Sequence, residues 1–368
     1  MPHILHVIDT TGPGGAETVF IEVADRIRSL GFESTVVVRG SGWVLDEVRR
    51  RNLDVYVIDA KGTANIAFVR SVLKLIRARN IDLIQSHLLG SNLYGAIISA
   101  LCRKPVIATF HGMVDVANTE RFMALKFTIM NLFVRHYVSV SERLLSLFEQ
   151  QYNLSRRKTQ VIYNGVDTAS YALATSSRLR TALNIPEHSH LFGCLGNVRP
   201  AKAYDVMTRA VAECVGRRID LHVVIAGDPK ARLMSELNRL AETLQVQDRI
   251  HYIGFIDDSA EFLSNVDGFL LSSSSEGFSI STIEAMAAGL PVVATRCGGP
   301  EEIIEHERTG WLVENGSAEA IAGAIETVVK QPELAQSIAA QGQVEAREKF
   351  DIEAMVSQYV QLYKVELQ

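Results

Sequence analysis

Two glutamates stand in a run of residue types that suits the binding of a phosphorylated sugar. Seven residues separate Glu276 from Glu284. Glu284 falls inside an otherwise apolar helical stretch, where a buried carboxylate is costly without hydrogen-bond donors, and sugar or ribose hydroxyls can supply them. Gly277 and the amides after it leave a helix N-terminus open to a phosphate. In the alternative, Glu276 caps the helix and Glu284 is exposed, which fits either residue alone but fits the whole run poorly.

A basic turn is the second group with phosphate chemistry. The segment 196–202, Gly-Asn-Val-Arg-Pro-Ala-Lys, follows a predicted strand and precedes a predicted helix. Arg199 offers a planar fork to phosphate oxygens and Lys202 a mobile point charge, so together they suit a diphosphate. The alternative is an ordinary exposed basic turn.

A glycine loop near the N-terminus is the third group. Gly12, Gly14 and Gly15 precede a helical pattern, but Glu17 stands where the dinucleotide fingerprint has its third glycine. This disfavours NAD. An anion bound by the amides of this loop at the helix start remains one interpretation, and a tight strand-to-helix turn is the other.

These groups depend on alternating strands and helices. In the first half, strands are predicted at 3–8, 35–38, 55–58, 83–86, 106–110 and 137–140, with helices at 16–30, 69–79 and 93–101. Alternation of this kind indicates parallel strands with crossover helices. The segment 167–190 breaks the pattern and is interpreted as a linker.

The alternation restarts after the linker. Strands are predicted at 191–195, 221–226, 250–253, 268–271 and 292–294, and helices at 204–215, 232–244, 281–288, 318–330 and 333–349, followed by an amphipathic segment, 352–367. The chain is therefore expected to hold two α/β domains. Ligands of open α/β sheets bind at the carboxyl ends of strands, which makes a cleft between the domains the natural active site.

Composition narrows the class of protein. The 368 residues carry 37 Lys and Arg against 42 Asp and Glu, a formal net charge of -5, so no nucleic-acid partner is expected. The four cysteines are far apart, which predicts a reduced cytoplasmic setting and no disulfide or cysteine metal site. The first residues lack a basic leader before an apolar run, so no signal peptide is expected.

The region 122–138 is the one stretch with a membrane signature. Lys126 and Arg135 interrupt it, so it is not predicted to span a bilayer. Flanked by Arg121 and Arg143, it can form a basic amphipathic helix lying at the inner face of a membrane. A helix packed on its own domain is the favoured alternative.

Taken together, these motifs resemble a known family, the retaining GT-B glycosyltransferases of glycosyltransferase family 4. The resemblance rests on the two glutamates followed by Ala-Met-Ala-x-Gly-x-Pro-Val, and on motifs in the family's order along nearly the whole chain. The further motifs are Gly14-Gly15-Ala16-Glu17, His111-Gly112, Ser141-Glu142, residues 163–167 with Asn164, the Arg199/Lys202 turn, Gly227-Asp228, and residues 298–302 with Gly310.

The resemblance implies a fold and the domain that binds each substrate. Two Rossmann-like domains are expected to face a central cleft: an N-terminal acceptor-binding domain, 1–168, and a C-terminal nucleotide-sugar-binding domain, 169–350. A C-terminal helix, within 351–368, is expected to cross back to the N-terminal domain. The donor would be a UDP- or GDP-sugar, and the acceptor a glycan or lipid-linked hydroxyl of cell-surface polysaccharide or glycolipid synthesis.

The resemblance also implies roles for single residues. Arg199 and Lys202 would neutralise the donor diphosphate, Glu284 would hold the ribose hydroxyls, and Glu276 the donor sugar. His111 would lie near the reaction centre. The remaining assignments are Gly15, Gly277 and Phe278 to phosphate through the backbone, and Asn164 to the lining of the cleft.

The sequence departs from the family pattern in the basic turn. Gly196-Asn197-Val198 replaces the usual Gly-Arg-Leu, which places Arg199 two positions late, and Ala203 stands where a glycine commonly follows the lysine. Lys202 is therefore the firmer equivalent. No two aspartates have the Asp-x-Asp spacing of metal-dependent glycosyltransferases, so a metal-independent reaction is expected, with cations and a helix start stabilising the leaving diphosphate.

Two other functions stay open. A nucleotide-sugar epimerase of the same fold would convert the donor with no acceptor present. A non-catalytic protein that binds nucleotide sugars would show binding without turnover.

Overall fold

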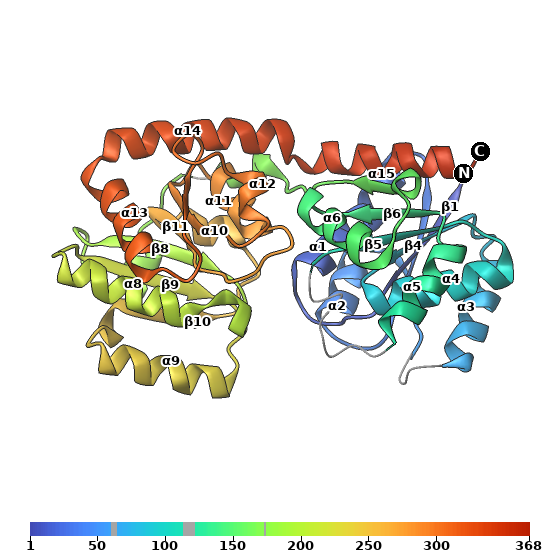
Figure 1. Cartoon of the computed structure of the whole chain (residues 1–368), viewed down its shortest axis with the longest axis horizontal. Helices are drawn as coiled ribbons and strands as arrows, with labels where there is room; N and C mark the ends of the chain where they lie inside the picture. Colours follow the sequence, from blue (N-terminus) through green and yellow to red (C-terminus); the bar gives the residue numbers. More distant parts are fainter. Residues whose placement is uncertain (60–64, 113–121, 173) are drawn as a thin grey trace. The chain divides into compact units, whose positions relative to one another are not determined.

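The chain divides into two compact units (Figure 1). The computed structural model describes residues 1–59, 65–112, 122–172 and 174–368. Unit 1 comprises Met1–Gly165 together with Ile352–Gln368, and unit 2 comprises Val166–Asp351. These limits lie within three residues of the domain limits expected from the sequence.

Each unit is built on a parallel sheet. Within the described residues, the sheet of unit 1 has the order β3-β2-β1-β4-β5-β6-β7 and that of unit 2 the order β10-β9-β8-β11-β12-β13. The strands of unit 1 are β1 His3–Ile8, β2 Glu33–Val38, β3 Asp54–Val57, β4 Leu83–His87, β5 Val106–Phe110, β6 His136–Ser139 and β7 Thr159–Val161. Those of unit 2 are β8 His190–Leu195, β9 Leu221–Ala226, β10 Ile250–Gly254, β11 Gly268–Leu271, β12 Val292–Thr295 and β13 Trp311–Val313. The predicted class, two Rossmann-like α/β domains, is confirmed.

The strand order reverses once in each sheet. In unit 1, β1 pairs with both β2 and β4, and in unit 2, β8 pairs with both β9 and β11. At such a point the chain leaves the two neighbouring strands toward opposite faces of the sheet, and the loops at their carboxyl ends enclose a crevice. The loops after β1, β4, β8 and β11 are therefore the places where a ligand is expected.

Helices cover both faces of each sheet. In unit 1 they are α1 Gly15–Arg26, α2 Trp43–Arg50, α3 Ile66–Ala78, α4 Leu89–Cys102, α5 Met123–Phe133, α6 Glu142–Tyr152 and α15 Ile352–Glu366. In unit 2 they are α7 Arg178–Ala182, α8 Tyr204–Gly216, α9 Ala231–Thr243, α10 Ser259–Leu263, α11 Ile280–Ala287, α12 Pro300–Ile303, α13 Ala318–Lys330 and α14 Pro332–Lys349. Among the helices in these ranges, none combines the length and apolar character that crossing a bilayer requires.

The last helix, α15, returns to unit 1, as the sequence predicts. It packs against α1, where Glu353 forms an ion pair with Arg26. At its other end Glu366 accepts a hydrogen bond from Arg135 at 2.8 Å. Tyr359 and Tyr363 of this helix are completely buried. The amphipathic pattern of 352–367 thus reflects packing within unit 1.

Two expectations about the fold are wrong. The sequence predicts that the first series of strands ends with the strand at 137–140, but α6 follows and then a seventh strand, β7. The segment 167–190 is not a linker but part of unit 2: Tyr171 is 9% exposed, and the amide of Leu179 donates to Asn265 at 3.0 Å. Its polar composition reflects short turns and the short helix α7, whose amides mostly donate to backbone carbonyls, as that of Ser176 does to Ser264 at 2.8 Å.

His6 lies at the centre of β1 and is completely buried. It faces Phe20 of α1 edge-on, and neither ring nitrogen has a hydrogen-bond partner among the described residues. Burial lowers the pKa of His6 to about 3. The folded chain therefore keeps this ring neutral at pH values where the unfolded chain protonates it, and acid favours unfolding.

Replacing His6 with leucine should make unit 1 less sensitive to acid. From pH ~6 down to pH ~3, a histidine that is neutral only when folded lowers the free energy of unfolding by about 1.4 kcal/mol per pH unit. We expect His6→Leu to remove that contribution. Above pH ~7, the free energy of unfolding of the variant should depend on pH as it does in the wild-type protein. The two tryptophans, Trp43 and Trp311, fall one in each unit, so Trp43 fluorescence in a Trp311→Phe background follows unit 1 through urea unfolding.

Ile4→Leu is the control for this measurement, because Ile4 is equally buried on the same face of β1 and does not titrate. It should leave the pH dependence unchanged. If His6→Leu also leaves it unchanged, His6 is protonated in the folded protein and the assignment of a neutral ring is wrong.

Candidate functional site

Lys202 ends the loop that follows β8. Its Nζ donates a hydrogen bond to Oε1 of Glu276 at 2.7 Å, and both side chains are largely shielded from solvent. The stem of the lysine passes over Gly196, where a Cβ would lie 2.5 Å from its Cε. Ala203 follows with φ +46°, a left-handed conformation that glycine adopts with less strain. This explains why a glycine is common after the lysine in the family that the sequence resembles.

Glu276 follows β11, the sheet neighbour of β8. Besides Lys202, Oε1 accepts a hydrogen bond from Ser273 at 2.7 Å. The alternative in which Glu276 caps the helix is excluded, because α11 begins at Ile280 with Ser279 as its N-cap. The glutamate instead lies in extended backbone, so its carboxylate faces the lysine rather than the helix N-terminus.

The backbone of Glu276 is held by the segment 297–299. Its amide donates to the carbonyl of Cys297 at 3.1 Å, and its carbonyl accepts from the amide of Gly299 at 3.0 Å. A Cβ on Gly299 would lie 2.7 Å from the Cα of Phe278. The Gly298-Gly299-Pro300 motif therefore acts through close backbone approach. Phe278 is buried against Phe350, so only its backbone can reach a ligand.

Glu284 lies on α11 and is enclosed by protein hydroxyls. Its Oε1 accepts hydrogen bonds from Tyr171 at 2.8 Å and from Ser259 at 3.1 Å. Burial raises the pKa of Glu284, and the two hydroxyls partly oppose that rise. Among the described residues no donor contacts Oε2. An exposed Glu284 is thus excluded, and one carboxylate oxygen remains for a ligand hydroxyl.

Tyr171 is a site residue that the sequence interpretation missed. It stands in the segment taken as a linker, and its hydroxyl bridges Ser259 and Glu284. Burial and the neighbouring carboxylate raise the pKa of Tyr171, so the phenol stays a donor. A lone aromatic residue in a polar, loop-like stretch is the signal that was available.

Arg199 is not drawn into this cluster. It is exposed, and its guanidinium forms neither an ion pair nor a hydrogen bond with any described residue, although its carbonyl accepts from the amide of Lys202 at 3.0 Å. It lies three positions before Lys202, at the start of the 3-10 turn Pro200–Lys202. The structure therefore unites Lys202, Glu276 and Glu284 on unit 2 and leaves Arg199 at its surface.

His111 lies in unit 1, directly after β5. Its Nε2 shares a hydrogen bond of 2.8 Å with Nδ1 of His87, the last residue of β4, and the two rings stack. Burial lowers the pKa of His111 to about 3 and that of His87 well below its usual value. Both rings are therefore neutral at physiological pH.

The hydrogen bond between His87 and His111 fixes how the two rings lie. The outer nitrogens of the pair, Nε2 of His87 and Nδ1 of His111, are both buried, so the surroundings do not distinguish which ring donates the shared proton. His87, which the sequence interpretation did not single out, orients His111 through this bond.

Gly15 is the first residue of α1, and Gly14 caps this helix without a side-chain hydrogen bond. A Cβ on Gly14 would lie 2.5 Å from Oε2 of Glu17, so the carboxylate of Glu17 folds back over the glycine loop. The residue that breaks the dinucleotide fingerprint thus brings negative charge to the helix start. Asn164, also in unit 1, is buried, and its Oδ1 has no hydrogen-bond partner among the described residues.

Asp9, at the carboxyl end of β1, is a second residue that the sequence interpretation missed. Its Oδ2 lies against Gly90, at the start of α4, and 3.8 Å from Nη1 of Arg39. Burial raises the pKa of Asp9 to about 6, although Arg39 opposes the rise. No cluster of three His, Cys, Asp or Glu side chains in the described ranges can hold a metal ion.

Two family models match adjoining parts of the chain. The model described as Glycosyltransferase Family 4 matches residues 13–170, and the model described as Glycosyl transferases group 1 matches residues 176–345. Together they cover most of both units.

Individual proteins are similar over nearly the whole chain. The N-acetyl-alpha-D-glucosaminyl L-malate synthase of Bacillus anthracis is 24% identical, covering 95% of this chain and 93% of its own. The lipopolysaccharide core biosynthesis glycosyltransferase LpsE of Rhizobium meliloti is 27% identical over 95% of both. The crystal structure of Anabaena HepE with UDP-glucose superposes with a TM-score of 0.88 at 24% identity, covering 99% of both chains, which shows the same fold.

Gly299 approaches Phe278 closely, whereas Gly323 has no such neighbour. A glycine-to-alanine substitution should therefore change the free energy of unfolding in opposite directions at these two positions. Gly299→Ala should lower the free energy of unfolding of unit 2 by about 1–3 kcal/mol, because the added methyl meets backbone atoms. Gly323→Ala, in the middle of α13, should raise that free energy by about 0.5–1 kcal/mol, because the nearest atom to the added Cβ would be Nη1 of Arg217 at 3.7 Å, an ordinary contact distance. Trp311 fluorescence in a Trp43→Phe background measures both. Equal effects would mean that Gly299 does not hold the Glu276 loop.

Proposed function

Because this chain belongs to the group 1 glycosyltransferases, we propose that it transfers a sugar, with retention of configuration, from a nucleotide-diphosphate sugar to an acceptor hydroxyl. The observation that carries the proposal is the Lys202–Glu276 pair at the carboxyl ends of β8 and β11, with Glu284 on the following helix. A diphosphate needs a cation, which Lys202 supplies. The hydroxyls of a sugar and of a ribose each need an acceptor, and the carboxylates of Glu276 and Glu284 supply them.

Binding of the donor would replace contacts that site residues make with one another in the ligand-free protein. Lys202 and Glu276 neutralise each other at 2.7 Å without a ligand. A bound diphosphate would attract the lysine, and the hydroxyls of the donor sugar would replace it on Glu276. The open Oε2 of Glu284 would accept from ribose hydroxyls. The amides of Gly277 and Phe278 and the exposed Arg199 would add donors to the phosphates.

In the reaction we propose, the bond between the anomeric carbon and the diphosphate breaks, the acceptor hydroxyl attacks the same face, and its proton passes to the leaving diphosphate oxygen. Lys202 stabilises the negative charge on the leaving diphosphate, together with the start of α11, so that no metal ion is required. Glu276 binds the sugar and forms no covalent bond to it. His111, held neutral by burial and oriented by His87, would lie near the reacting carbon.

The relatives support UDP-sugars as the first donors to test. The HepE structure contains UDP-glucose, and LpsE is named for lipopolysaccharide core biosynthesis. We propose a UDP- or GDP-sugar as donor and a glycan or lipid-linked glycan as acceptor, in polysaccharide or glycolipid synthesis in the cytoplasm.

An exposed apolar stripe on α5 supports an acceptor at a membrane surface. Three large side chains fall on one side of the helix at 100° per residue and are 42–68% exposed; they are Leu125, Leu132 and Phe133. Phe122, which is 76% exposed, directly precedes the helix as its N-cap. The sequence predicts a basic amphipathic helix here, but the exposed face is apolar, and Arg135 is paired with Glu366. We propose that this stripe inserts into the interface of the inner membrane leaflet.

Lys202→Ala should lower the turnover of sugar transfer by about 10²–10³-fold, because a preorganised charge on the leaving group is lost. Turnover is measured with the donor identified by a thermal-shift screen of UDP-, GDP- and ADP-sugars, since a donor that binds the folded chain raises its melting temperature. Lys330→Ala removes an exposed lysine from α13 of the same unit and should leave turnover unchanged. Wild-type turnover in Lys202→Ala would refute the assignment.

Two additions to this assay separate the alternatives. EDTA should leave turnover unchanged. A loss of turnover on addition of EDTA would show that a metal ion is required. Donor incubated without acceptor should stay unconverted, whereas a new nucleotide sugar would identify an epimerase. Donor binding without any turnover would point to a non-catalytic protein.

Membrane binding should depend on the apolar stripe rather than on charge. The double substitution Leu125→Ser/Leu132→Ser should weaken binding to vesicles with roughly 30% phosphatidylglycerol by about tenfold or more, because two exposed leucines no longer enter the interface. Vesicle sedimentation measures this. Leu30→Ser, at an exposed leucine of unit 1 outside the stripe, is the control. Binding that disappears in about 0.5 M NaCl would indicate a basic surface instead.

A further inference from the structure

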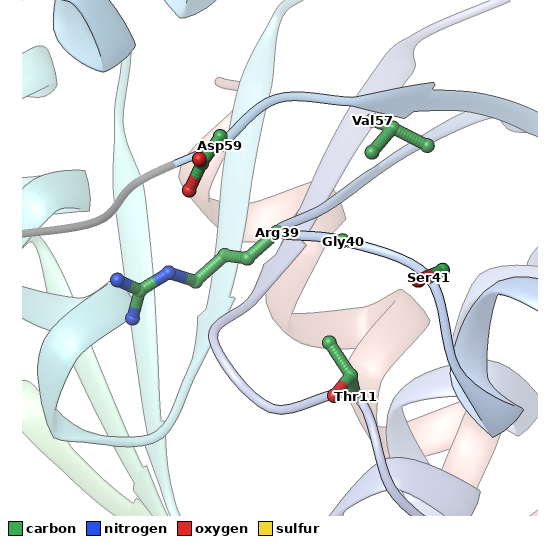
Figure 2. A pocket seen from close by; sticks show the side chains of 6 residues that line it. All are labelled: Thr11, Arg39, Gly40, Ser41, Val57 and Asp59. Carbon is green, nitrogen blue, oxygen red and sulfur yellow. The ribbon is translucent and has the colours of Figure 1, made fainter.

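The loops after β8 and β11 in unit 2 lie wholly within the described residues, so the hydrogen bonds around Lys202 and Glu276 can be followed one by one. Unit 1 differs in this respect. Its pocket of about 510 Å³ at the ends of β2 and β3 is lined by Arg39 and Asp59 among others (Figure 2), and Asp59 directly precedes the segment 60–64, which lies outside the described residues. The groups around the lysine–glutamate pair are therefore the ones whose roles the structure defines.

Two adjacent serines after β11 contact opposite partners of this pair. Oγ of Ser272 donates to the carbonyl of Lys202 at 2.9 Å, and Oγ of Ser273 donates to Oε1 of Glu276 at 2.7 Å. A carbonyl and an ionised carboxylate can only accept, so the serine is the donor in each bond. Both serines are buried. Neither belongs to a motif on which the family resemblance rests.

The serine segment is itself anchored. The carbonyl of Ser273 accepts from the hydroxyl of Thr295, on β12, at 2.5 Å. The amide of Ser274 donates at 2.7 Å to the carbonyl of Ala201, the residue before Lys202. The segment is thus joined to the lysine loop at two successive carbonyls and held from behind by the neighbouring strand.

Ser272 acts at a strained point of the backbone. The carbonyl of Lys202 belongs to the peptide plane that leads into Ala203, whose φ is +46°. This left-handed conformation is costly for a residue other than glycine. Because the hydroxyl of Ser272 holds that peptide plane, the lysine stem leaves the loop from a fixed position over Gly196.

Ser273 acts on the orientation of the Glu276 carboxylate. Both hydrogen bonds that described residues donate to this carboxylate reach Oε1. The terminal torsion of a glutamate is broad, so one retained donor is enough to select an orientation. When a diphosphate attracts Lys202, Ser273 still holds Oε1, and Oε2 stays available to a ligand hydroxyl in one orientation.

We propose that Ser272 and Ser273 are positioning residues of the donor site: Ser272 fixes Lys202 for the diphosphate, and Ser273 fixes Glu276 for the hydroxyls of the donor sugar. The proposal rests on the transferase function proposed above and assigns different parts of the donor to two neighbouring serines. Their removal should therefore have different consequences for the sugar and for the diphosphate.

Calorimetric titration with a nucleotide sugar and with its nucleoside diphosphate separates the two roles. The pairs are UDP-glucose and UDP, GDP-mannose and GDP, and ADP-glucose and ADP, and the pair that the wild-type protein binds is used for the variants. Ser273→Ala should weaken binding of the nucleotide sugar about tenfold and that of the diphosphate by less than about twofold, because a hydrogen bond to a charged group is lost only where the sugar binds. Ser272→Ala should weaken both by a similar factor, about fivefold.

Three further variants control the measurement. Ser275→Ala, at an exposed serine of the same segment, should change neither affinity. Ser273→Cys keeps a weak donor and should fall between the wild-type protein and Ser273→Ala. Ser273→Ala should have no further effect in a Glu276→Ala background. Equal weakening of both ligands by Ser273→Ala, or no weakening of either, overturns the proposal.

Hydrogen exchange measured by mass spectrometry distinguishes this failure from a failure of the transferase function. The amide of Lys202 donates to the carbonyl of Arg199 at 3.0 Å, and Ser272→Ala should make the peptide 196–204 exchange faster, whereas Ser275→Ala should not. If a donor binds and the peptide is unchanged, the role of Ser272 fails and the transferase function stands. If no ligand pair binds, the transferase function and the donor-site roles fail, although faster exchange would still show that Ser272 holds the loop.

Discussion

The hydrogen bond between Lys202 and Glu276 joins residues 74 positions apart, and the rest of the site is arranged around it. It forms because β8 and β11 are neighbours at the point where strand order reverses, so that the loops after them meet. Gly196 leaves room for the lysine stem, and Gly299 brings a third loop against the backbone that carries the glutamate. A paired charge of this kind keeps both groups desolvated and ordered until a ligand with complementary charge replaces each partner.

Burial determines the chemistry of unit 1 in two opposite directions. It keeps His6, His87 and His111 neutral by lowering their pKa values, and it raises the pKa of Asp9 to about 6. A neutral His111 adds no charge to its surroundings, whereas Lys202 brings a cation to the loop after β8 in unit 2. In the proposed reaction that cation would serve the diphosphate.

Much of the fold follows from local patterns. Apolar runs alternating with helical spacing indicate parallel sheets, and the strands predicted in both halves are present within a few residues. The strand at Thr159–Val161 was not predicted, because it is three residues long and half-buried and therefore has no apolar run. The segment 167–190 was mistaken for a linker because its order comes from contacts with distant residues, such as that between Leu179 and Asn265, rather than from its own periodicity.

The sequence alone determined which loops carry chemistry: glycines, a lysine and two glutamates placed after strands identify Lys202, Glu276 and Glu284. It did not determine their partners. Tyr171 meets Glu284 across 113 residues, and His87 meets His111 across 24, because strand pairing and burial, not spacing, bring them together. Charge states were also decided only in the folded chain, since a pKa depends on desolvation and on neighbours that approach through space.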